Sequence, residues 1–317
     1  MIEQTRVSAA LSLEHVLLPD GETIEHEIFR QSGRVSRHRH YRVYLPKGYT
    51  EKCKYPLLMV LHGCRQDHQD IQSITGFDAI ADRVGAIVVY PYITTYAGVR
   101  TENCWGWWLT RERQRGQGEV ADLRQIAEEV CSTYSVDSTR RHICGLSAGA
   151  AMSVASLAAY SDFWLSGASV AGVPYGESAN SVQVNPHMPV RRKSVGTLVR
   201  MLSRELIAPA PSLLVVQSDA DKMVGPSLGA NLRDSWVTVS GCRQQPSEVC
   251  VDESRGFTWQ FEQYLSRGAL QVGHILLEGL EHGWPGGLPG KFCFPDAPNI
   301  SELIWTFFDN DSTGAVN

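Results

Sequence analysis

The chain lacks a long apolar run. Its first 20 residues carry Glu3 near the start and contain no uninterrupted apolar core. A secretory signal peptide needs an apolar stretch of roughly 7–15 residues, and a membrane-spanning helix needs about 20. We therefore expect neither, which favours a cytoplasmic protein. A secreted or periplasmic protein stays open as the alternative in case a leader has been removed.

An excess of positive charge is also absent. The formal net charge is −5, from 29 Lys and Arg against 34 Asp and Glu. An extended nucleic-acid surface would need a clustered excess of Lys and Arg, so we expect no nucleic-acid partner. One basic stretch, between residues 34 and 42, is interpreted as a solvated hairpin or loop, and no function is assigned to it.

No two of the eight cysteines form a Cys-x-x-Cys pair. Structural zinc sites commonly use such pairs, and the chemistry inferred below needs no metal, so we expect no metal and no cofactor. Cys131 falls on a predicted helix and Cys144 on a predicted strand. Unpaired cysteine behaves as a small hydrophobe in such places, so both are expected to be free.

The pattern of apolar residues predicts the fold class. With 317 residues and 43% apolar content, the chain can bury one large core, and we expect a single domain over residues 1–317. Buried strands alternate with helical patterns, which predicts an α/β fold with a mostly parallel sheet and helices on both faces. Insertions or a partial lid are expected at 174–208 and 240–266. The predicted strands are 23–29, 42–45, 56–61, 86–90, 141–144, 166–171 and 212–217, and the predicted helices are 77–84, 120–130 and 300–308.

Residues 145–149 read G-L-S-A-G and lie between a predicted strand and a run of small residues that begins at Ala150. In a G-x-S-x-G elbow the serine is flanked by glycines because the strand-to-helix turn is sharp, and side chains there would collide with neighbours. The pattern alone is a weak signal. Its place between a strand and a helix makes Ser147 the candidate nucleophile.

A second strand and turn supports this interpretation. The apolar segment 55–61 ends in H-G-C at residues 62–64. In serine hydrolases of the α/β-hydrolase type, the loop after this early strand supplies one backbone N–H of the oxyanion hole, and the residue after the nucleophile supplies the other. Cys64 and Ala148 hold these positions. The alternative is that this turn only ends a strand, and the order of the two elements favours catalysis.

The acid and then the histidine follow the serine in this fold. His274 lies inside an apolar strand-like run, where a histidine is more often a hydrogen-bonded wall residue. His282 lies in a Gly-rich loop just beyond that run and is our choice for the base. The acid should follow the buried strand 212–217, as both Asp219 and Asp221 do. Spacing favours Asp221, which lies further out on the loop.

Six segments resemble, in order, the signature blocks of esterases related to polyhydroxybutyrate depolymerases, a family that extends to bacterial feruloyl and acetylxylan esterases. The resemblance spans about residues 40–308. The segments are L-H-G-C-R-Q (61–66), N-C-W-G-W-W (103–108), R-G-Q-G-E (115–119), G-L-S-A-G (145–149), D-A-D (219–221) and H-G-W-P-G-G (282–287).

This resemblance implies an α/β-hydrolase fold and assigns the site. Carried over residue by residue, it makes Ser147 the nucleophile, Asp221 the acid and His282 the base, and it puts Cys64 at the oxyanion hole. Two departures from the family pattern concern substrate contacts more than chemistry: Ala150 stands where a further glycine is usual, and Gly106 where an asparagine is common.

Four tryptophans are concentrated in two of these segments, which the resemblance brings to the mouth of the site. Trp107 and Trp284 are the first candidates for substrate contacts, followed by Trp108 and Trp105. Together they would form an aromatic wall for an acyl group or a sugar-linked phenol. The alternative is that some of them pack beneath the loops.

The disulfide pairing of the eight cysteines is open from sequence. Two pairs are candidates. Cys242 and Cys250 flank a short loop, and Cys64 and Cys104 lie near the proposed site. Such bridges suit an oxidising compartment.

Together these features predict a serine carboxylic ester hydrolase that works through an acyl-enzyme. We expect hydroxyalkanoate oligomers or other small soluble esters as substrates, because enzymes that attack solid polyester usually carry a separate surface-binding module and this chain ends soon after its last predicted helix. A feruloyl or acetylxylan esterase is the alternative within the family. A peptidase, a thioesterase or a non-catalytic binding protein on the same fold is the alternative from another class, since one constellation serves several acyl groups.

Overall fold

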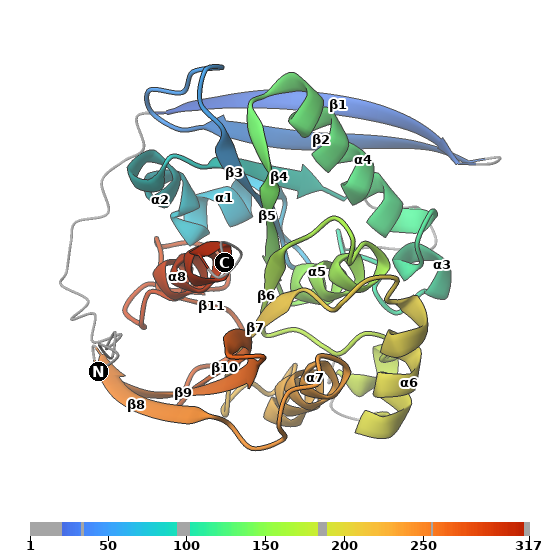
Figure 1. The fold of residues 1–317 in the computed structure, drawn as a ribbon, viewed down its shortest axis with the longest axis vertical. Coiled ribbons are helices and arrows are strands. Elements are labelled where there is room, and N and C mark those ends of the chain that lie inside the picture. Colours follow the sequence, from blue (N-terminus) through green and yellow to red (C-terminus); the bar gives the residue numbers. More distant parts are fainter. Residues whose placement is uncertain (1–20, 33–34, 94–101, 183–188, 255, 314–317) are drawn as a thin grey trace.

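The computed structural model describes residues 21–32, 35–93, 102–182, 189–254 and 256–313 (Figure 1). Most strands form one mixed sheet, in the spatial order β1-β2-β4-β3-β5-β6-β7-β10-β9-β8, and β11 and β12 form a small separate pair. The strands are β1 (Glu22–Ser32), β2 (Val35–Leu45), β3 (Tyr55–Leu61), β4 (Ile87–Tyr92), β5 (Val136–Leu146), β6 (Ser166–Val170), β7 (Ser212–Ser218), β8 (Glu248–Ser254), β9 (Phe257–Ser266), β10 (Ala269–Leu277), β11 (Trp284–Pro285) and β12 (Cys293–Phe294).

The middle of the sheet is parallel and its edges are antiparallel. Strands from β4 to β10, in spatial order, pair in parallel, whereas β1 and β2 at one edge and β9 and β8 at the other pair antiparallel. All seven residues of β3 and all seven of β7 are buried. Parallel strands covered on both faces have no solvent side, which explains the uniformly apolar sequence of β3 and the apolar run from Leu213 to Val216 in β7.

Helices cover both faces of the sheet. Helices α1, α2 and α8 lie on one face, and α4, α5 and α7 lie on the other (Figure 1). This is the predicted α/β class with a mostly parallel sheet. The helices are α1 (His68–Thr75), α2 (Phe77–Val84), α3 (Thr110–Arg113), α4 (Gly118–Thr133), α5 (Ala148–Ala159), α6 (Val195–Glu205), α7 (Pro226–Val239) and α8 (Ile300–Thr313), with a 3₁₀ turn over Ala179–Ser181.

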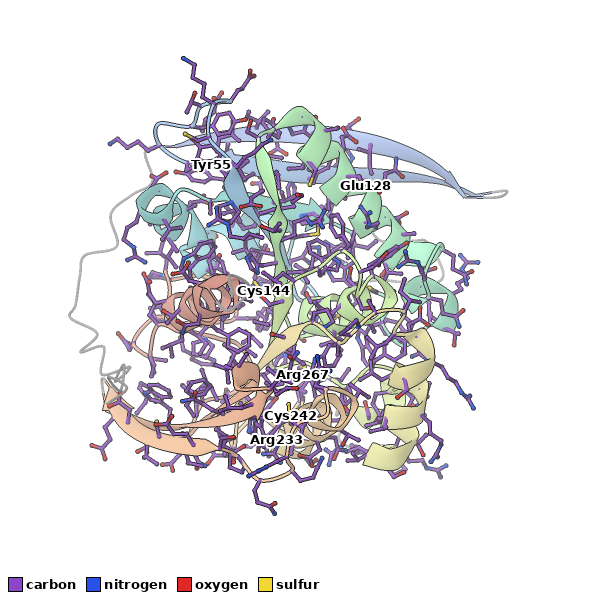
Figure 2. The ribbon with its side chains drawn as sticks, viewed as in Figure 1. Tyr55, Glu128, Cys144, Arg233, Cys242 and Arg267 are labelled. Carbon is purple, nitrogen blue, oxygen red and sulfur yellow. A yellow bond between two sulfur atoms is a disulfide. The ribbon has the colours of Figure 1, made fainter. Side chains whose placement is uncertain are left out.

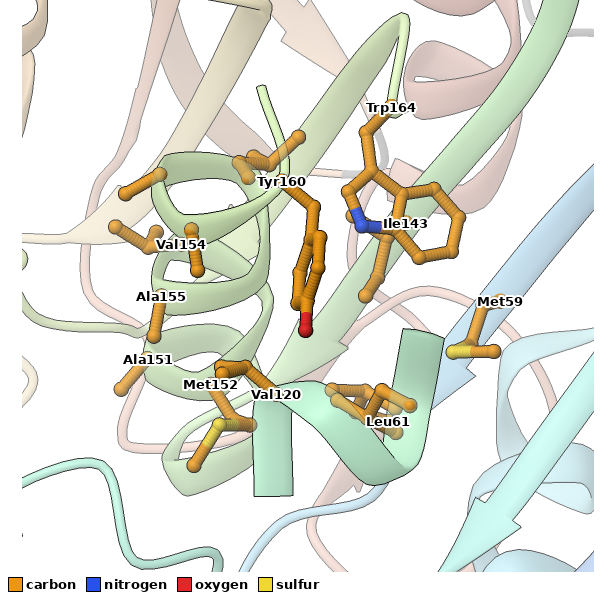
Figure 3. Close-up of a cluster of buried hydrophobic side chains, with 14 of the residues drawn as sticks. Met59, Leu61, Val120, Ile143, Ala151, Met152, Val154, Ala155, Tyr160 and Trp164 are labelled. Atoms are coloured by element: carbon orange, nitrogen blue, oxygen red, sulfur yellow. The ribbon is translucent and has the colours of Figure 1, made fainter. Parts of the chain in front are cut away.

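Helix α5 is buried on every side. All 12 of its residues are covered, because it packs on β5 and β6 and is flanked by α3, α4 and α6. The side chains of Tyr160 and Trp164, just beyond its end, lie beside Ile143 of β5 (Figure 3). A helix held this firmly gives the residue at its start a rigid support.

The basic stretch predicted as a solvated hairpin or loop belongs, from residue 35, to β2, which pairs antiparallel with the preceding strand β1. Arg39 is buried and forms an ion pair with Asp122 of α4 (Nη2 to Oδ2, 2.9 Å), each side chain being 1% exposed. Charge alone argues for solvent exposure, but β2 lies between β1 and β4, so alternate side chains face the covering helix. The prediction was therefore wrong for Arg39.

The segment 240–266, expected as an insertion or a partial lid, contains β8 and β9, which extend the sheet beyond β10 as an antiparallel edge. The other irregular segment, 174–208, contains the 3₁₀ turn and α6, and α6 packs against α5 and α7. Residues 183–188 of that segment lie outside the described residues.

The cysteines at this end of the molecule are not bridged to each other. Cys242 is buried and Cys250 is exposed, and both are free, so the pairing considered for them is wrong. Cys131 and Cys144 are free as expected. Cys144 lies at the centre of the molecule, whereas Cys242 lies near the end of α7 (Figure 2).

Among the helices of the described residues, none combines the length and the apolar character that a bilayer crossing requires.

The buried imidazole of His142 makes the stability of this fold depend on pH. Its Nδ1 lies 2.8 Å from Oγ of Ser166, its ring stacks on Phe308, and burial lowers its pKa from 6.5 to about 3. Below pH 6.5 the imidazole of His142 binds a proton in the unfolded chain, whereas in the folded chain it stays neutral until about pH 3. The free energy of unfolding therefore falls by up to about 1.4 kcal/mol per pH unit, until the folded pKa is reached.

We expect the His142→Gln variant to lose less stability than the wild type as the pH falls from about 6.5 to 4, as measured by urea denaturation at several pH values. Burial raises the pKa of Asp78 to about 6, which acts in the opposite sense. Subtracting the two curves removes that contribution, because Asp78 is present in both proteins. An equal loss of unfolding free energy in the two proteins as the pH falls would contradict the assignment of this pH dependence to His142.

Candidate active site

Ser147 lies at the turn between β5 and α5. Its backbone adopts φ 56° and ψ −115°, a conformation that costs on the order of 1–3 kcal/mol for a non-glycine residue. Its N–H donates to the carbonyl oxygen of Val170 at 2.9 Å, and its own carbonyl accepts from the N–H of Ala151 at 3.0 Å. These bonds hold the strained turn and leave the Ser147 side chain partly exposed in an otherwise buried segment.

Close packing requires the glycines of the elbow. A Cβ on Gly145 would lie 2.7 Å from the carbonyl oxygen of Leu61, and a Cβ on Gly149 would collide with the carbonyl oxygens of Leu61 and His62. These obstacles are backbone atoms at the end of a central strand and cannot swing aside. The elbow is thus pressed against the end of β3, the strand that leads into the H-G-C loop.

His282 lies in the loop that follows β10. Its Nε2 lies 2.8 Å from Oγ of Ser147, and its Nδ1 lies 2.7 Å from Oδ2 of Asp221. A carboxylate only accepts hydrogen bonds, so Nδ1 carries the proton and Nε2 accepts from the serine hydroxyl. The ring is therefore held in the tautomer that a general base requires.

Asp221 lies on the turn that follows β7 and is 3% exposed. Its Oδ1 accepts from the N–H groups of Met223 at 2.9 Å and Val224 at 2.8 Å, which directs Oδ2 toward His282. On β7 itself, Gln217 donates from Nε2 to the carbonyl oxygen of Val224 at 2.7 Å. This bond ties the turn to the sheet.

Ser218 and Asp219, close to Asp221 in sequence, bind the backbone of the loop that carries His282. Oγ of Ser218 donates to the carbonyl oxygen of Leu280 at 2.7 Å and accepts from its N–H at 3.1 Å. Oδ1 of Asp219 accepts from the N–H of Gly279 at 2.8 Å. The two aspartates considered for the acid therefore differ in position: Asp219 binds the loop backbone, and Asp221 binds the imidazole.

His274, the other histidine considered, lies in a separate network. It is buried on β10, and its Nδ1 lies 2.9 Å from Oε2 of Glu262 and 3.2 Å from Nη1 of Arg233. The hydrogen bond from His274 and the nearby Arg233 charge lower the pKa of Glu262 to about 2. The structure thus places His274 in a hydrogen-bonded network that joins β10, β9 and α7.

The H-G-C loop lies directly against the serine. A Cβ on Gly63 would be 3.5 Å from Cβ of Ser147. Nδ1 of the buried His62 donates to the carbonyl oxygen of Gly63 at 2.8 Å, and its Nε2 accepts from the N–H of Ile93 at 3.3 Å. In a trans peptide the C=O and the following N–H point in opposite directions, so this bond directs the amide of Cys64 away from His62.

His62 can hold this arrangement because it stays neutral. Burial lowers its pKa to about 4, so at neutral pH one ring nitrogen donates and the other accepts. Ala148, the other candidate oxyanion donor, is the first residue of α5. The N–H groups in the first turn of a helix have no partner within the helix, which leaves such an amide available to an anion.

Gln66 and Gln217 support the site and were not singled out from sequence. Oε1 of Gln66 accepts from the N–H of Gly63 at 2.9 Å, and its Nε2 donates to the carbonyl oxygen of Lys291 at 2.9 Å. Gln66 belongs to a signature block, which was the available signal. Gln217 had only the weak signal of being a polar residue in an apolar strand.

The candidate pair Cys64 and Cys104 forms a disulfide. Cys64 belongs to the H-G-C loop and Cys104 to the N-C-W segment that carries the tryptophans. The bridge therefore joins the loop beside Ser147 to the segment that carries the tryptophans, and the prediction for this pair is confirmed.

Trp105 and Trp284 are fully buried, so the prediction that they contact substrate is wrong. Nε1 of Trp105 donates to the carbonyl oxygen of His62 at 3.0 Å, and Nε1 of Trp284 donates to Oγ of Ser301 at 3.1 Å. Each indole thus has a polar partner as well as a packed ring. Both rings lie in the interior of the protein and offer no surface to a ligand.

Trp107 and Trp108 lie nearer the surface. Their rings pack edge to face, with centroids 5.4 Å apart. Trp107 is 8% exposed, and Trp108 is partly exposed. The backbone before them is fixed by the N–H of Gly106, which donates to Oε2 of the buried Glu119 at 2.7 Å. Of the four tryptophans, these two remain candidates for substrate contacts.

The chain is similar in sequence to known esterases. The model of the family described as "Esterase PHB depolymerase" matches residues 39–241, more than half of the chain. Poly(3-hydroxyalkanoate) depolymerase C of Paucimonas lemoignei is 27% identical over 235 residues, which are 73% of this chain and 55% of that protein. Feruloyl esterase B of Neurospora crassa is 23% identical, covering 70% of this chain and 79% of that protein. The chain thus spans about half the length of the depolymerase.

Solved structures share the fold. An acetyl xylan esterase from Aspergillus awamori superposes with a TM-score of 0.64 at 14% identity and covers 86% of this chain and 94% of that chain. A ferulic acid esterase from Anaeromyces mucronatus, in complex with ferulic acid, gives a TM-score of 0.55 at 17% identity, covering 94% of this chain and 93% of that chain. The α/β-hydrolase type of fold is thereby shown.

We expect Gly149→Ala to lower the free energy of unfolding by about 1–3 kcal/mol, because the added methyl meets the carbonyl oxygens at the end of β3. Gly196→Ala is the matched control: its Cβ, on the exposed start of α6, would meet Nη1 of Arg200 at 3.8 Å. That change should be neutral or stabilising by about 0.4–1 kcal/mol. Equal melting curves for the two variants would contradict this account of the elbow.

Proposed function

Because this chain belongs to the Esterase PHB depolymerase family, we propose that it is a serine carboxylic ester hydrolase in which Ser147, His282 and Asp221 are the catalytic triad. One observation carries the proposal: the unbroken line of hydrogen bonds, 2.8 Å from Ser147 to His282 and 2.7 Å from His282 to Asp221. Nucleophile, base and orienting acid within hydrogen-bond reach are the geometry that acyl transfer needs.

The first half of the reaction forms an acyl-enzyme. Oγ of Ser147 attacks the ester carbonyl carbon while Nε2 of His282 takes its proton. Asp221 stabilises the imidazolium and keeps the ring in place. When the tetrahedral intermediate collapses, the C–O bond to the alcohol breaks, and the imidazolium gives its proton to the departing oxygen. The acyl group is then bound to Ser147 as an ester.

Water completes the cycle by the same route. His282 removes a proton from water, the hydroxide adds to the acyl carbon, and the acid leaves as Ser147 regains its proton. In both halves the carbonyl oxygen becomes an anion, which the amides of Cys64 and Ala148 stabilise. Losing one such donor typically costs about 10²–10³ in turnover.

We place hydroxyalkanoate oligomers or other small soluble esters first among the substrates. The support is the sequence similarity to a poly(3-hydroxyalkanoate) depolymerase at 27% identity. Feruloyl or acetylxylan esters are the second candidate. The similarity to a feruloyl esterase and the partly exposed ring of Trp108, beside Trp107, favour an acyl group with an aromatic face.

We expect Ser147→Ala to lower kcat on p-nitrophenyl butyrate by on the order of a millionfold, because the nucleophile and base act as one unit. Asp221→Asn should cost about 10⁴-fold, since the amide would favour the wrong imidazole tautomer. Asp219→Asn, whose carboxylate binds Gly279, should cost less than about tenfold. Circular dichroism and thermal melts would check that each variant is folded.

A fluorophosphonate probe gives a second measurement. It should label the wild type and fail to label Ser147→Ala, which would exclude a purely binding role. Equal and mild effects of the two aspartate variants would overturn the choice of the acid. Labelling that persists without Ser147 would overturn the nucleophile.

A substrate panel separates the acyl classes. We expect the highest kcat/KM on 3-hydroxybutyrate oligomers among a set that includes methyl ferulate, acetylated xylan, an aminoacyl anilide and an acyl thioester. A preference for methyl ferulate or acetylated xylan would select the second candidate. Turnover confined to the anilide or the thioester would remove the chain from the carboxylic ester hydrolases. Clearing of a solid polyester film would contradict the preference for soluble substrates.

A further inference from the structure

Arg192 lies directly against the turn that follows Asp221. A Cβ on Gly225 would lie 2.9 Å from Nη2 and 3.9 Å from Cζ of Arg192. The backbone of Gly225 has φ −59° and ψ 152°, a conformation that any residue adopts. The backbone therefore does not require glycine at this position, whereas the guanidinium of Arg192 uses the space that a side chain would fill.

The segment that carries Arg192 is held on both sides of that residue. The N–H of Arg191 donates to the carbonyl oxygen of Asn180 at 2.9 Å. The N–H of Lys193 donates to Oε2 of the buried Glu177 at 3.0 Å, and its Nζ pairs with Oε1 of the same carboxylate at 3.5 Å. The backbone around Arg192 is therefore fixed to the segment that follows β6.

One imidazole ring separates the turn under Arg192 from Ser147. Oδ1 of Asp221 accepts from the N–H of Val224 on this turn at 2.8 Å. Oδ2 of Asp221 lies 2.7 Å from Nδ1 of His282, and Nε2 of His282 lies 2.8 Å from Oγ of Ser147. A substrate chain that extends from Ser147 past His282 meets this turn next.

The surface of the turn is cationic and apolar. Arg192 and Lys222 are exposed, and within the described parts of the chain no carboxylate pairs with either side chain. Met223 is 42% exposed. The carboxylate of Asp219, on the same turn, is bound to the N–H of Gly279. Guanidinium and ammonium groups without a counter-ion attract an anion, and the thioether of Met223 offers a contact to apolar groups.

A hydroxyalkanoate oligomer has matching chemistry. Each of its units carries a short apolar segment, and the chain has a hydroxyl at one end and a carboxylate at the other. At every ester bond the acyl half leads to the hydroxyl end and the alcohol half leads to the carboxylate end. His282 gives its proton to the oxygen of the alcohol half, so that half begins beside His282 and extends toward the turn.

We propose that Arg192, assisted by Lys222, binds the terminal carboxylate of a hydroxyalkanoate oligomer, while Met223 contacts its apolar units. This inference rests on the proposed function and names the substrate as the ionised acid form of the oligomer. A planar guanidinium forms two parallel hydrogen bonds to a carboxylate, which an ammonium group does not. The preference for a charged chain end therefore depends mainly on Arg192.

Binding at a distance from the bond that breaks changes KM and leaves kcat alone. The terminal carboxylate keeps its charge throughout the reaction, so Arg192 stabilises the bound substrate and the transition state equally. Exposed ion pairs contribute little, and bidentate arginine pairs contribute more. We therefore expect an effect on KM of about three- to tenfold.

The test compares the 3-hydroxybutyrate trimer with its terminal amide, in which a neutral carboxamide replaces the carboxylate. The wild type should have a KM for the acid about three- to tenfold below its KM for the amide, at equal kcat. Arg192→Gln should raise the KM for the acid to that for the amide, and should leave the KM for the amide and kcat on p-nitrophenyl butyrate unchanged. Added salt should reduce the wild-type preference, because the paired charges are exposed.

Three further variants provide the controls. Arg192→Lys should keep part of the preference, since the ammonium retains the charge and loses the second parallel hydrogen bond. Lys222→Gln should lower the preference by less than Arg192→Gln does. Arg243→Gln should leave both KM values unchanged, because Arg243 is exposed beyond the far end of α7, a helix of 14 residues and about 21 Å. Thermal melts would check that each variant is folded.

Failures of this inference and of the proposed function can be told apart. Equal KM values for acid and amide, in a wild type that hydrolyses p-nitrophenyl butyrate, would overturn the carboxylate site alone, as would turnover of that ester and of neither trimer. An equal rise of both KM values in Arg192→Gln would assign Arg192 to the shape of the loop and also overturn the inference. A chain that hydrolyses no ester and takes no fluorophosphonate label would overturn the proposed function together with this inference.

Discussion

The parallel register of the central strands places every group of the site. Leu61 pairs with Gly145, Leu146 pairs with Val170, and Ser218 pairs with Leu277. Strands β3, β5, β6, β7 and β10 therefore end on the same side of the sheet, and the segments that follow β3, β5, β7 and β10 carry Cys64, Ser147, Asp221 and His282. In this way Ser147 and His282, 135 residues apart in sequence, come within hydrogen-bond distance.

Register brings the groups together, and close contacts then orient them. The elbow is forced into its conformation because the helix start is pressed against the end of β3, where no Cβ fits at Gly149. The remaining loops are held by polar groups that each have a defined partner: Asp221 takes two amides and one imidazole, and Ser218 binds the histidine loop twice. Such satisfied networks keep side chains in one arrangement, which is what pre-organised catalysis requires.

The parts of the fold that the sequence predicted share one physical property: their burial follows from the residues of one short stretch. Strand β3 is apolar throughout, β7 has an apolar run from Leu213 to Val216, and the elbow carries glycines where backbone meets backbone. Predictions failed where distant contacts decide. Arg39 is buried because α4 brings Asp122 to it, and Trp284 is buried because α8 brings Ser301 to it.

The sequence by itself determined the class of fold, the order of the candidate site segments and the residue types in each, because apolar periodicity and glycine positions are properties of short stretches. It left two aspartates, two histidines and two cysteine pairs as alternatives. Tertiary structure decided their places: Asp221 and His282 line up with Ser147, Asp219 and His274 bind elsewhere, and Cys64 meets Cys104. Distances between segments depend on how strands pair and loops pack, and no short stretch of sequence contains that information.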